Sequence, residues 1–145
     1  MKKTIYLSSI LLTSFLFISN TFAADDCVQK RKTPQAPSNI FKQTNPLEST
    51  PENIAAGEML YKKGAKPLAC SQCHGRRGKG NGKMATGMTP KPRDFSCQTM
   101  MKDIPDGQLF WIIKNGSKGT AMMGFKALKD NQIWQLVSYI RKLAK

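Results

Sequence analysis

The sequence predicts a mostly α-helical chain with long loops, organised as one small domain behind an extended N-terminal arm. Its 145 residues are typical of a single domain. Apolar residues recur at helical spacing in three segments, whereas no segment of any length alternates in the way a strand does. The apolar share of 40% and the charged share of 22% exclude a collagen-like or low-complexity chain.

Residues 1–23 predict a secretory signal peptide. A positive start, Met1-Lys2-Lys3, precedes an apolar run from Ile5 to Ile18, and Thr21-Phe22-Ala23 supplies the small residues that precede a cleavage site. We expect cleavage after Ala23 and a periplasmic mature protein, whose cysteines would meet an oxidising environment. An uncleaved anchor is the alternative, but the apolar run is short for one.

Residues 24–49 predict the extended arm. This stretch is polar and basic, contains Pro34, Pro37 and Pro46, and shows neither helical nor strand periodicity. It leaves residues 50–145 as the expected folded domain.

The first two helices are marked by terminal signals. Thr50 is a good N-cap, Pro51 suits the first helical position, and the pattern ends near Gly64. The second helix is predicted from Pro105 to Lys114, because Asn115-Gly116 is a typical stop.

The third helix is predicted from about Asp130 to the C-terminus. Between the helices, residues 70–93 are rich in Gly, Lys and Pro and predict a loop with short helical turns at most. Short helices and long loops make a thin core, and such chains usually need a disulfide, a metal or a cofactor.

The motif Cys70-Ser71-Gln72-Cys73-His74 has the C-x-x-C-H spacing of covalent haem attachment. Two thiols on one turn of backbone can each add to one of the two vinyl groups of a haem. The histidine that follows then reaches the iron as an axial ligand. The chain contains one histidine, and it lies in this motif. We therefore predict one haem c, bound through Cys70 and Cys73, with its iron held by His74.

Three other interpretations of the motif fit the sequence less well. A structural zinc site needs a second ligand pair, whereas Cys27 and Cys97 stand alone. A thioredoxin-type redox pair needs a preceding strand and a βαβ pattern, and neither is present. A simple disulfide between Cys70 and Cys73 leaves the histidine unexplained.

An electron-transfer haem needs a second axial ligand, and methionine is the natural candidate because no other histidine exists. Met122 stands out because it lies in a loop, residues 119–125, after the second helix. Other methionines follow the haem motif and are interpreted mainly as core residues: Met84, Met88, Met100, Met101 and Met123.

The chain resembles the class I monohaem cytochrome c family from Thr50 to Lys145. The resemblance implies the family fold, three main helices and loops around one covalent haem. It also places Met122 at the position of the sixth ligand, where the family commonly reads Gly-Thr-x-Met-Pro-x-Phe. Met123 replaces the usual proline and remains a rival ligand. The segments that carry the resemblance are Cys70–Gly75, Pro90–Phe95, Asp106–Trp111, Gly119–Phe125 and Trp134–Leu143.

The resemblance further implies that the first and last helices cross. Gly57 and Tyr61 match the first helix, and Leu136 and Tyr139 match the last. A glycine inside a helix costs stability, so a packing reason for Gly57 is expected independently.

A further implication is that a loop proline carbonyl accepts a hydrogen bond from the axial histidine, orienting its ring. Pro90 and Pro92 are the candidates, and a loop-stiffening role for either is the alternative.

Cys27 and Cys97 fall outside the family pattern. In an oxidising compartment they are expected to form a disulfide that fixes the arm to the domain. Two free thiols, or a bridge to another chain, are the alternatives.

The formal net charge is +14, and Arg76, Arg77, Lys79 and Lys83 directly follow the haem motif. Export argues against a nucleic-acid partner. The basic side chains are either a solvated loop or a docking site for acidic redox proteins, such as an oxidase, reductase or dehydrogenase. Anionic membrane lipids are another target of the charge.

The sequence therefore predicts a periplasmic single-electron carrier rather than an enzyme. Two alternatives remain open: a fixed electron-transfer subunit of a larger oxidoreductase, or a haem enzyme or gas sensor in which Met122 is a labile ligand.

Overall fold

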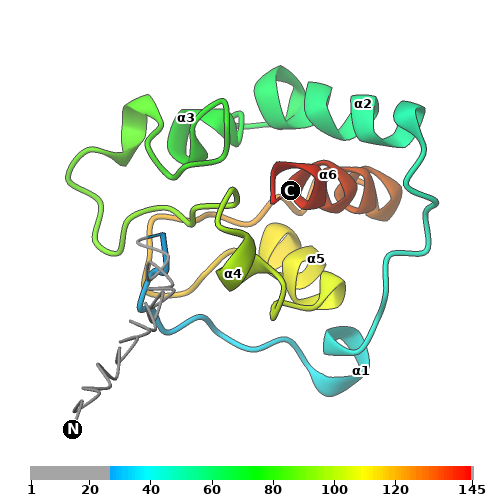
Figure 1. Cartoon of the computed structure of the whole chain (residues 1–145), viewed down its shortest axis with the longest axis horizontal. Coiled ribbons are helices and arrows are strands. Elements are labelled where there is room, and N and C mark those ends of the chain that lie inside the picture. The colour runs from blue at the N-terminus through cyan, green and yellow to red at the C-terminus, as the bar shows by residue number, and fades with distance from the viewer. Residues whose placement is uncertain (1–26, 145) are drawn as a thin grey trace, which may run out of the picture.

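The computed structural model describes residues 27–144 (Figure 1). The predicted signal peptide lies outside them. Within this range the chain forms helices and loops and no strand, which confirms the predicted fold class. None of the helices in this range is long and apolar enough to cross a membrane. The elements are α1 (Ser38–Phe41), α2 (Pro51–Met59), the π-helix η1 (Leu60–Gly64), α3 (Ser71–His74), the 3₁₀-helix η2 (Lys83–Ala85), α4 (Gln98–Met101), α5 (Asp106–Asn115) and α6 (Asp130–Leu143).

The first predicted helix is present and ends where expected. The Thr50 hydroxyl accepts a hydrogen bond from the Asn53 backbone N–H at 3.3 Å, so Thr50 caps α2. The helix continues as η1 and ends at Gly64. The change to π-helical geometry in its last turn has no signal in the sequence.

The other two main helices also match the prediction. Helix α5 starts after Pro105, and Gly116 ends it in a left-handed conformation with φ of 79°. Helix α6 starts at Asp130, where the Lys129 N–H donates to the Gln132 side chain at 2.9 Å. Figure 1 shows α2, α6 and α5 stacked in that order.

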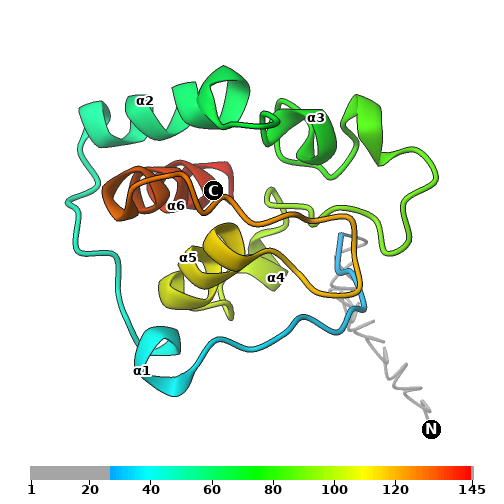
Figure 2. The ribbon, with the colours of Figure 1, turned by 180° about the vertical axis from the view of Figure 1, so that it is seen from behind.

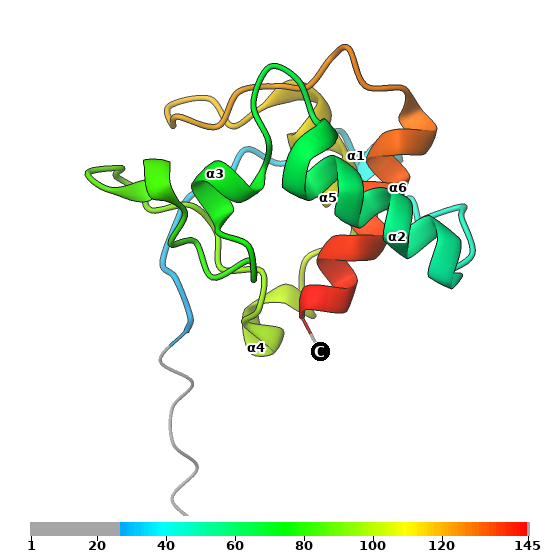
Figure 3. The same cartoon turned by 90° about the horizontal axis from the view of Figure 1, so that it is seen from above.

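Helices α2 and α6 cross in close contact (Figure 3). Gly57 makes the contact possible, since a Cβ atom there would lie 2.0 Å from the Gln135 carbonyl oxygen. One turn further on, the ring of Tyr61 packs 5.2 Å from that of Tyr139, measured between centroids. Gly57, Tyr61 and Tyr139 therefore meet at the crossing as the resemblance implies, and Leu136 is buried in the core.

Helix α5 packs against the other side of α6. Phe110 stacks on Trp134 with centroids 4.4 Å apart, and both rings are buried. The Arg141 guanidinium reinforces this contact, because its Nε donates to the Asp106 carboxylate at 2.7 Å. These apolar faces form the core. Helices α3 and α5 also border a cavity.

The N-terminal arm runs along the edge of the domain and is bonded to it (Figure 1). The buried Gln108 side chain of α5 accepts from the Ala36 N–H at 2.8 Å and donates to the Pro34 carbonyl at 2.9 Å. Farther along, the Asn45 side chain donates to the Ser138 hydroxyl of α6 at 2.9 Å. The arm is extended as predicted, except for the single helical turn of α1, which the sequence analysis missed.

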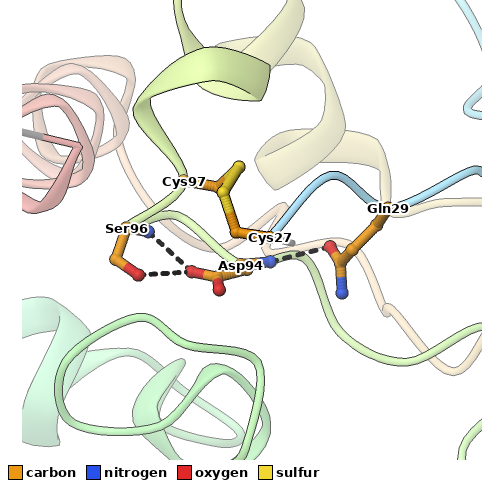
Figure 4. Close-up of a disulfide and its surroundings, with 5 residues drawn as sticks. All are labelled: Cys27, Gln29, Asp94, Ser96 and Cys97. Atoms are coloured by element: carbon orange, nitrogen blue, oxygen red, sulfur yellow. Dashed lines mark hydrogen bonds between the residues drawn. A yellow bond between two sulfur atoms is a disulfide. The ribbon is translucent and has the colours of Figure 1, made fainter. Parts of the chain in front are cut away.

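The arm is also held covalently. Cys27 and Cys97 form a disulfide, as expected, with their Cα atoms 5.5 Å apart (Figure 4). Cys97 is buried at the start of α4. The bond therefore fixes the first described residue of the arm to the middle of the chain.

Replacing both Cys27 and Cys97 with serine is expected to lower the free energy of unfolding by about 4 kcal/mol, the chain-entropy value for so long a loop. The bridged residues are 70 positions apart. Urea titration of the mature protein measures the change. Wild-type protein treated with dithiothreitol is the control and should match the variant, and equal midpoints for oxidised wild type and variant would contradict the expectation.

Candidate functional site

An apolar cavity opens between α3, α5, α6 and the loops that precede α4 and α6. Figure 2 shows the second of these loops, residues 116–129, returning from the end of α5 to the start of α6. The aliphatic side chains that line the cavity include Leu68, Ile104, Leu109, Ile112, Ile113, Leu136 and Ile140. Such a lining is typical of a binding site for a mostly apolar small molecule or cofactor.

The C-x-x-C-H motif forms one wall of the cavity. Cys70 precedes the single turn of α3, and Cys73 and His74 lie on it, so all three side chains border the same space. The two thiols are unbonded, so the alternative of a Cys70–Cys73 disulfide is not realised. Burial raises the pKa of Cys70 to about 12 and raises that of Cys73 as well. Both are therefore neutral thiols at pH 7.

His74 is buried and fixed on two sides. Its Nδ1–H donates to the Arg93 carbonyl oxygen at 3.0 Å, and its ring stacks on Phe95 with centroids 4.3 Å apart. Because a carbonyl can only accept, the proton is on Nδ1 and the lone pair of Nε2 is free. Burial lowers the pKa of His74 to about 4, so the ring is neutral at pH 7 and able to bind a metal.

The carbonyl that orients the histidine corrects one expectation. The family pattern suggested Pro90 or Pro92, but the acceptor is the carbonyl of Arg93. Both prolines border the same cavity and confine the loop on either side of Lys91. Arg93, the residue after Pro92, presents its carbonyl to His74. Every residue has a carbonyl, so residue type does not determine which one is the acceptor.

The arm supports this acceptor. The Gln29 side chain accepts from the Asp94 N–H at 2.9 Å (Figure 4). It also donates to the Pro92 carbonyl at 3.1 Å, so it bonds to the residues on both sides of Arg93. Asp94 also accepts from the backbone N–H of Ser96 at 2.8 Å. Gln29 therefore acts on His74 through the backbone that holds its hydrogen-bond acceptor.

Replacing Gln29 with alanine is expected to raise the midpoint reduction potential of the mature protein slightly. A looser Arg93 carbonyl would weaken the hydrogen bond of His74 and leave the imidazole a poorer electron donor. Redox titration followed by absorbance measures this. Gln35→Ala, on an exposed position of the same arm, is the matched control. Equal potentials for Q29A and wild type would show that the arm does not influence the histidine.

A second contact holds the motif to the helix crossing. The Tyr61 hydroxyl, on η1, donates to the Gly75 carbonyl at 2.8 Å, directly after His74. Burial raises the pKa of Tyr61, so the hydroxyl keeps its proton and remains a donor. The packing of α2 on α6 therefore helps to fix the position of α3.

Met122 and Met123 border the cavity from the loop before α6. The Met122 N–H donates to the Thr120 hydroxyl at 3.1 Å, and its carbonyl accepts from the Ser117 N–H at 2.9 Å. The Met122 side chain packs against the core, whereas Met123 is 44% exposed. The backbone is therefore held at Met122, and the burial favours Met122 over its rival as the residue that faces the cavity.

The residues present fit a c-type haem. Two free thiols, a neutral histidine with a free Nε2 and a methionine thioether border one apolar space, and soft sulfur and imidazole donors suit haem iron. The zinc alternative lacks support, because nowhere in residues 27–144 do three His, Cys, Asp or Glu side chains converge as metal ligands. The fit therefore concerns both the attachment chemistry and the apolar character of the lining.

Comparison with known proteins agrees with this site. The family model described as cytochrome c matches residues 54–144. The chain belongs to the cytochrome c family. This cytochrome c is also similar to a chain of the reducing HAO-like protein complex of Kuenenia stuttgartiensis, with 30% sequence identity and a TM-score of 0.59. The similarity covers 69% of this chain and 47% of that one, so this cytochrome spans about half of the solved chain. No curated protein matches its sequence significantly.

Sequence reasoning missed several residues that shape the site of this cytochrome. Phe95 lies in one of the segments that carry the family resemblance, but nothing in the sequence indicated that its ring would stack on His74. Gln29 and Arg31 were interpreted only as part of a polar arm. An indirect signal existed, because a disulfide from Cys27 to Cys97 must bring the arm next to the segment before Cys97.

Proposed function

We propose that this cytochrome c is an exported single-electron carrier. Cys70 and Cys73 would bind one haem c covalently, and His74 and Met122 would hold its iron. The haem supplies an iron that alternates between the ferric and ferrous states when bound. Membership of the cytochrome c family implies haem-based electron transfer, and the finer assignment of ligands and role rests on the site geometry.

The observation that carries the proposal is the meeting of separate segments at one apolar cavity. The attachment motif on α3 and Met122 in the loop before α6 are 48 or more residues apart, yet both border it. With His74 and Met122 both bound to the iron, no position on the metal would remain for a substrate. The residues of this chain would then orient the ring nitrogen of His74, exclude water and keep the site similar in both oxidation states, as electron transfer requires and catalysis on a substrate does not.

The test is an absorption spectrum of the mature protein, exported with a haem-attachment system and recorded oxidised and reduced. We expect the pyridine haemochrome assay to show a haem attached through two thioether bonds. We also expect the spectrum to show sharp low-spin bands and the weak long-wavelength band of a ferric Met–iron bond. A high-spin spectrum would favour a haem enzyme or gas sensor. A protein without haem would overturn the proposal.

The redox partners are proposed to be acidic-surfaced proteins. Arg76, Arg77, Lys79 and Lys83 all lie exposed directly after α3, where they flank the attachment motif. The three ion pairs of residues 27–144 involve other cations, so these four charges are available to steer an approaching anion. The same positive charge would also attract anionic lipid surfaces.

Replacing these four cations with glutamine is expected to slow oxidation by ferricyanide about tenfold or more at low ionic strength, because steering of an anion is lost. Stopped-flow measurement at two salt concentrations tests this. Oxidation by the cationic tris(phenanthroline)cobalt(III) is the control and should become faster. Equal changes for both oxidants would contradict electrostatic steering.

A fixed electron-transfer subunit is the second candidate function. The similar solved chain is part of a protein complex, and it is about twice as long as the segment that this cytochrome matches. Purification from its native host distinguishes the two candidates. A second chain present at a constant stoichiometric ratio would favour the subunit, and a free monomer would favour the carrier.

A further inference from the structure

Among residues 27–144, the lining of the cavity carries positive charge and contains no carboxylate to balance it. Seven titratable residues line the cavity, and none is a carboxylate: Arg31, Tyr61, Cys70, Cys73, His74, Lys91 and Arg93. The thiols and the phenol are neutral at pH 7, and so is the buried histidine. The lining is therefore cationic through one lysine and two arginines.

The two guanidinium groups are held in place but are not neutralised. Arg31 donates to the Lys91 carbonyl, and Arg93 donates to the Thr33 hydroxyl at 2.9 Å. Within residues 27–144 neither forms an ion pair. The Nε atom of Arg31 is buried without a hydrogen-bond partner. Each group thus keeps unused donors beside a cavity.

This arrangement is costly without an anion. Both guanidinium groups are half-buried and carry charge of the same sign. A half-buried charge without a partner is unfavourable, and a second charge of the same sign adds to the cost. Guanidinium groups present paired N–H donors that match the two oxygens of a carboxylate.

We propose that Arg31 and Arg93 together bind the propionate carboxylates of the haem. The inference rests on the proposed function, because it assumes that a haem occupies this cavity. Arg93 belongs to the region matched by the family model, but Arg31 lies outside it, on the arm fixed by Cys27–Cys97. The arm is thereby part of the cofactor site and supplies one of its two anion-binding groups.

The test compares Arg31→Gln and Arg93→Gln with wild type in the haem-loaded protein. Haem made with ¹³C at its propionate carboxyl carbons allows infrared spectroscopy to follow the ionisation of these groups with pH. Each variant is expected to raise the pKa of at least one propionate and to lower the midpoint reduction potential, because a cation that favours the ferrous state is lost. Lys30→Gln removes the same charge from an exposed neighbour and should change neither property.

Arg31→Lys provides a rescue, since it keeps the charge and loses the paired donors. In Arg31→Lys the midpoint potential should return most of the way from the Arg31→Gln value to the wild-type value. The propionate pKa should return less fully. Arg31→Lys also keeps the test decisive if Arg93→Gln does not fold. Unchanged propionate ionisation in Arg31→Gln and Arg31→Lys would overturn the proposal.

A free anion is the competing occupant of the pair. Inorganic phosphate is therefore added at constant ionic strength. A shift of the wild-type potential that Arg31→Gln abolishes would assign the pair to a free anion and overturn the propionate assignment. Failure of the proposed function looks different, because the pyridine haemochrome assay would then detect no covalent haem in any variant.

Discussion

Replacing Met122 with alanine is expected to convert the low-spin ferric spectrum to a high-spin or water-ligated one and to remove the long-wavelength Met–iron band. The midpoint potential should fall strongly, because a thioether ligand favours ferrous iron. Carbon monoxide should bind the reduced variant rapidly, since one axial position becomes open. Absorption spectra and redox titration of the mature protein measure all three effects.

Met123→Ala is the matched control, one residue along the same loop. Met123 is 44% exposed, whereas Met122 packs against the core and its backbone is bonded on both sides to Ser117 and Thr120. The control should therefore retain the long-wavelength band and most of the potential. Loss of the band in Met123→Ala with retention in Met122→Ala would reverse the assignment.

The helices could be predicted because their boundaries are set locally. Thr50 caps α2 through its own side chain, and Gly116 ends α5 because it adopts a positive φ. The attachment motif was equally readable, since Cys70, Cys73 and His74 are neighbours in sequence and need one turn of backbone to lie together. In each case the residues that matter lie within a few positions of one another.

The contacts of the arm could not be predicted in the same way. Gln29 bonds to Pro92 and Asp94, which lie 63 and 65 positions along the chain, and Arg31 bonds to Lys91, which lies 60 positions along. Glutamine and arginine on a polar segment carry no periodic signal, because their partners are backbone atoms of any residue type. Only the two cysteines outside the haem motif indicated which loop the arm would meet.

The hydrogen bond of His74 shows a finer limit. The family pattern places a carbonyl of the proline-containing loop against the axial histidine, and that expectation was correct for the loop and wrong for the residue. The carbonyl comes from Arg93, one position after Pro92. Every residue offers a carbonyl, so the register depends on how Gln29 and Phe95 hold the loop, and these are tertiary contacts.

Replacing Gly57 with alanine is expected to lower the free energy of unfolding by about 4 kcal/mol or more, a large part of the stability of a domain this size. The added Cβ atom would lie 2.0 Å from the Gln135 carbonyl oxygen and 2.6 Å from its carbon. Both are backbone atoms of α6, so no rotamer change relieves the overlap and the helices must move apart. Thermal and urea unfolding of the mature protein measure the loss.

The sign of this effect identifies its cause. Helix propensity alone predicts that alanine at a glycine position stabilises a helix by about 1 kcal/mol. Ala55→Gly, at an exposed position of the same helix, is the control and should cost about 1 kcal/mol by propensity alone. Stabilisation by Gly57→Ala would mean that α2 and α6 do not need this close approach. If the helices move apart, Tyr61 should move with them. Because the Tyr61 hydroxyl donates to the Gly75 carbonyl, the helix crossing would then also affect the position of His74.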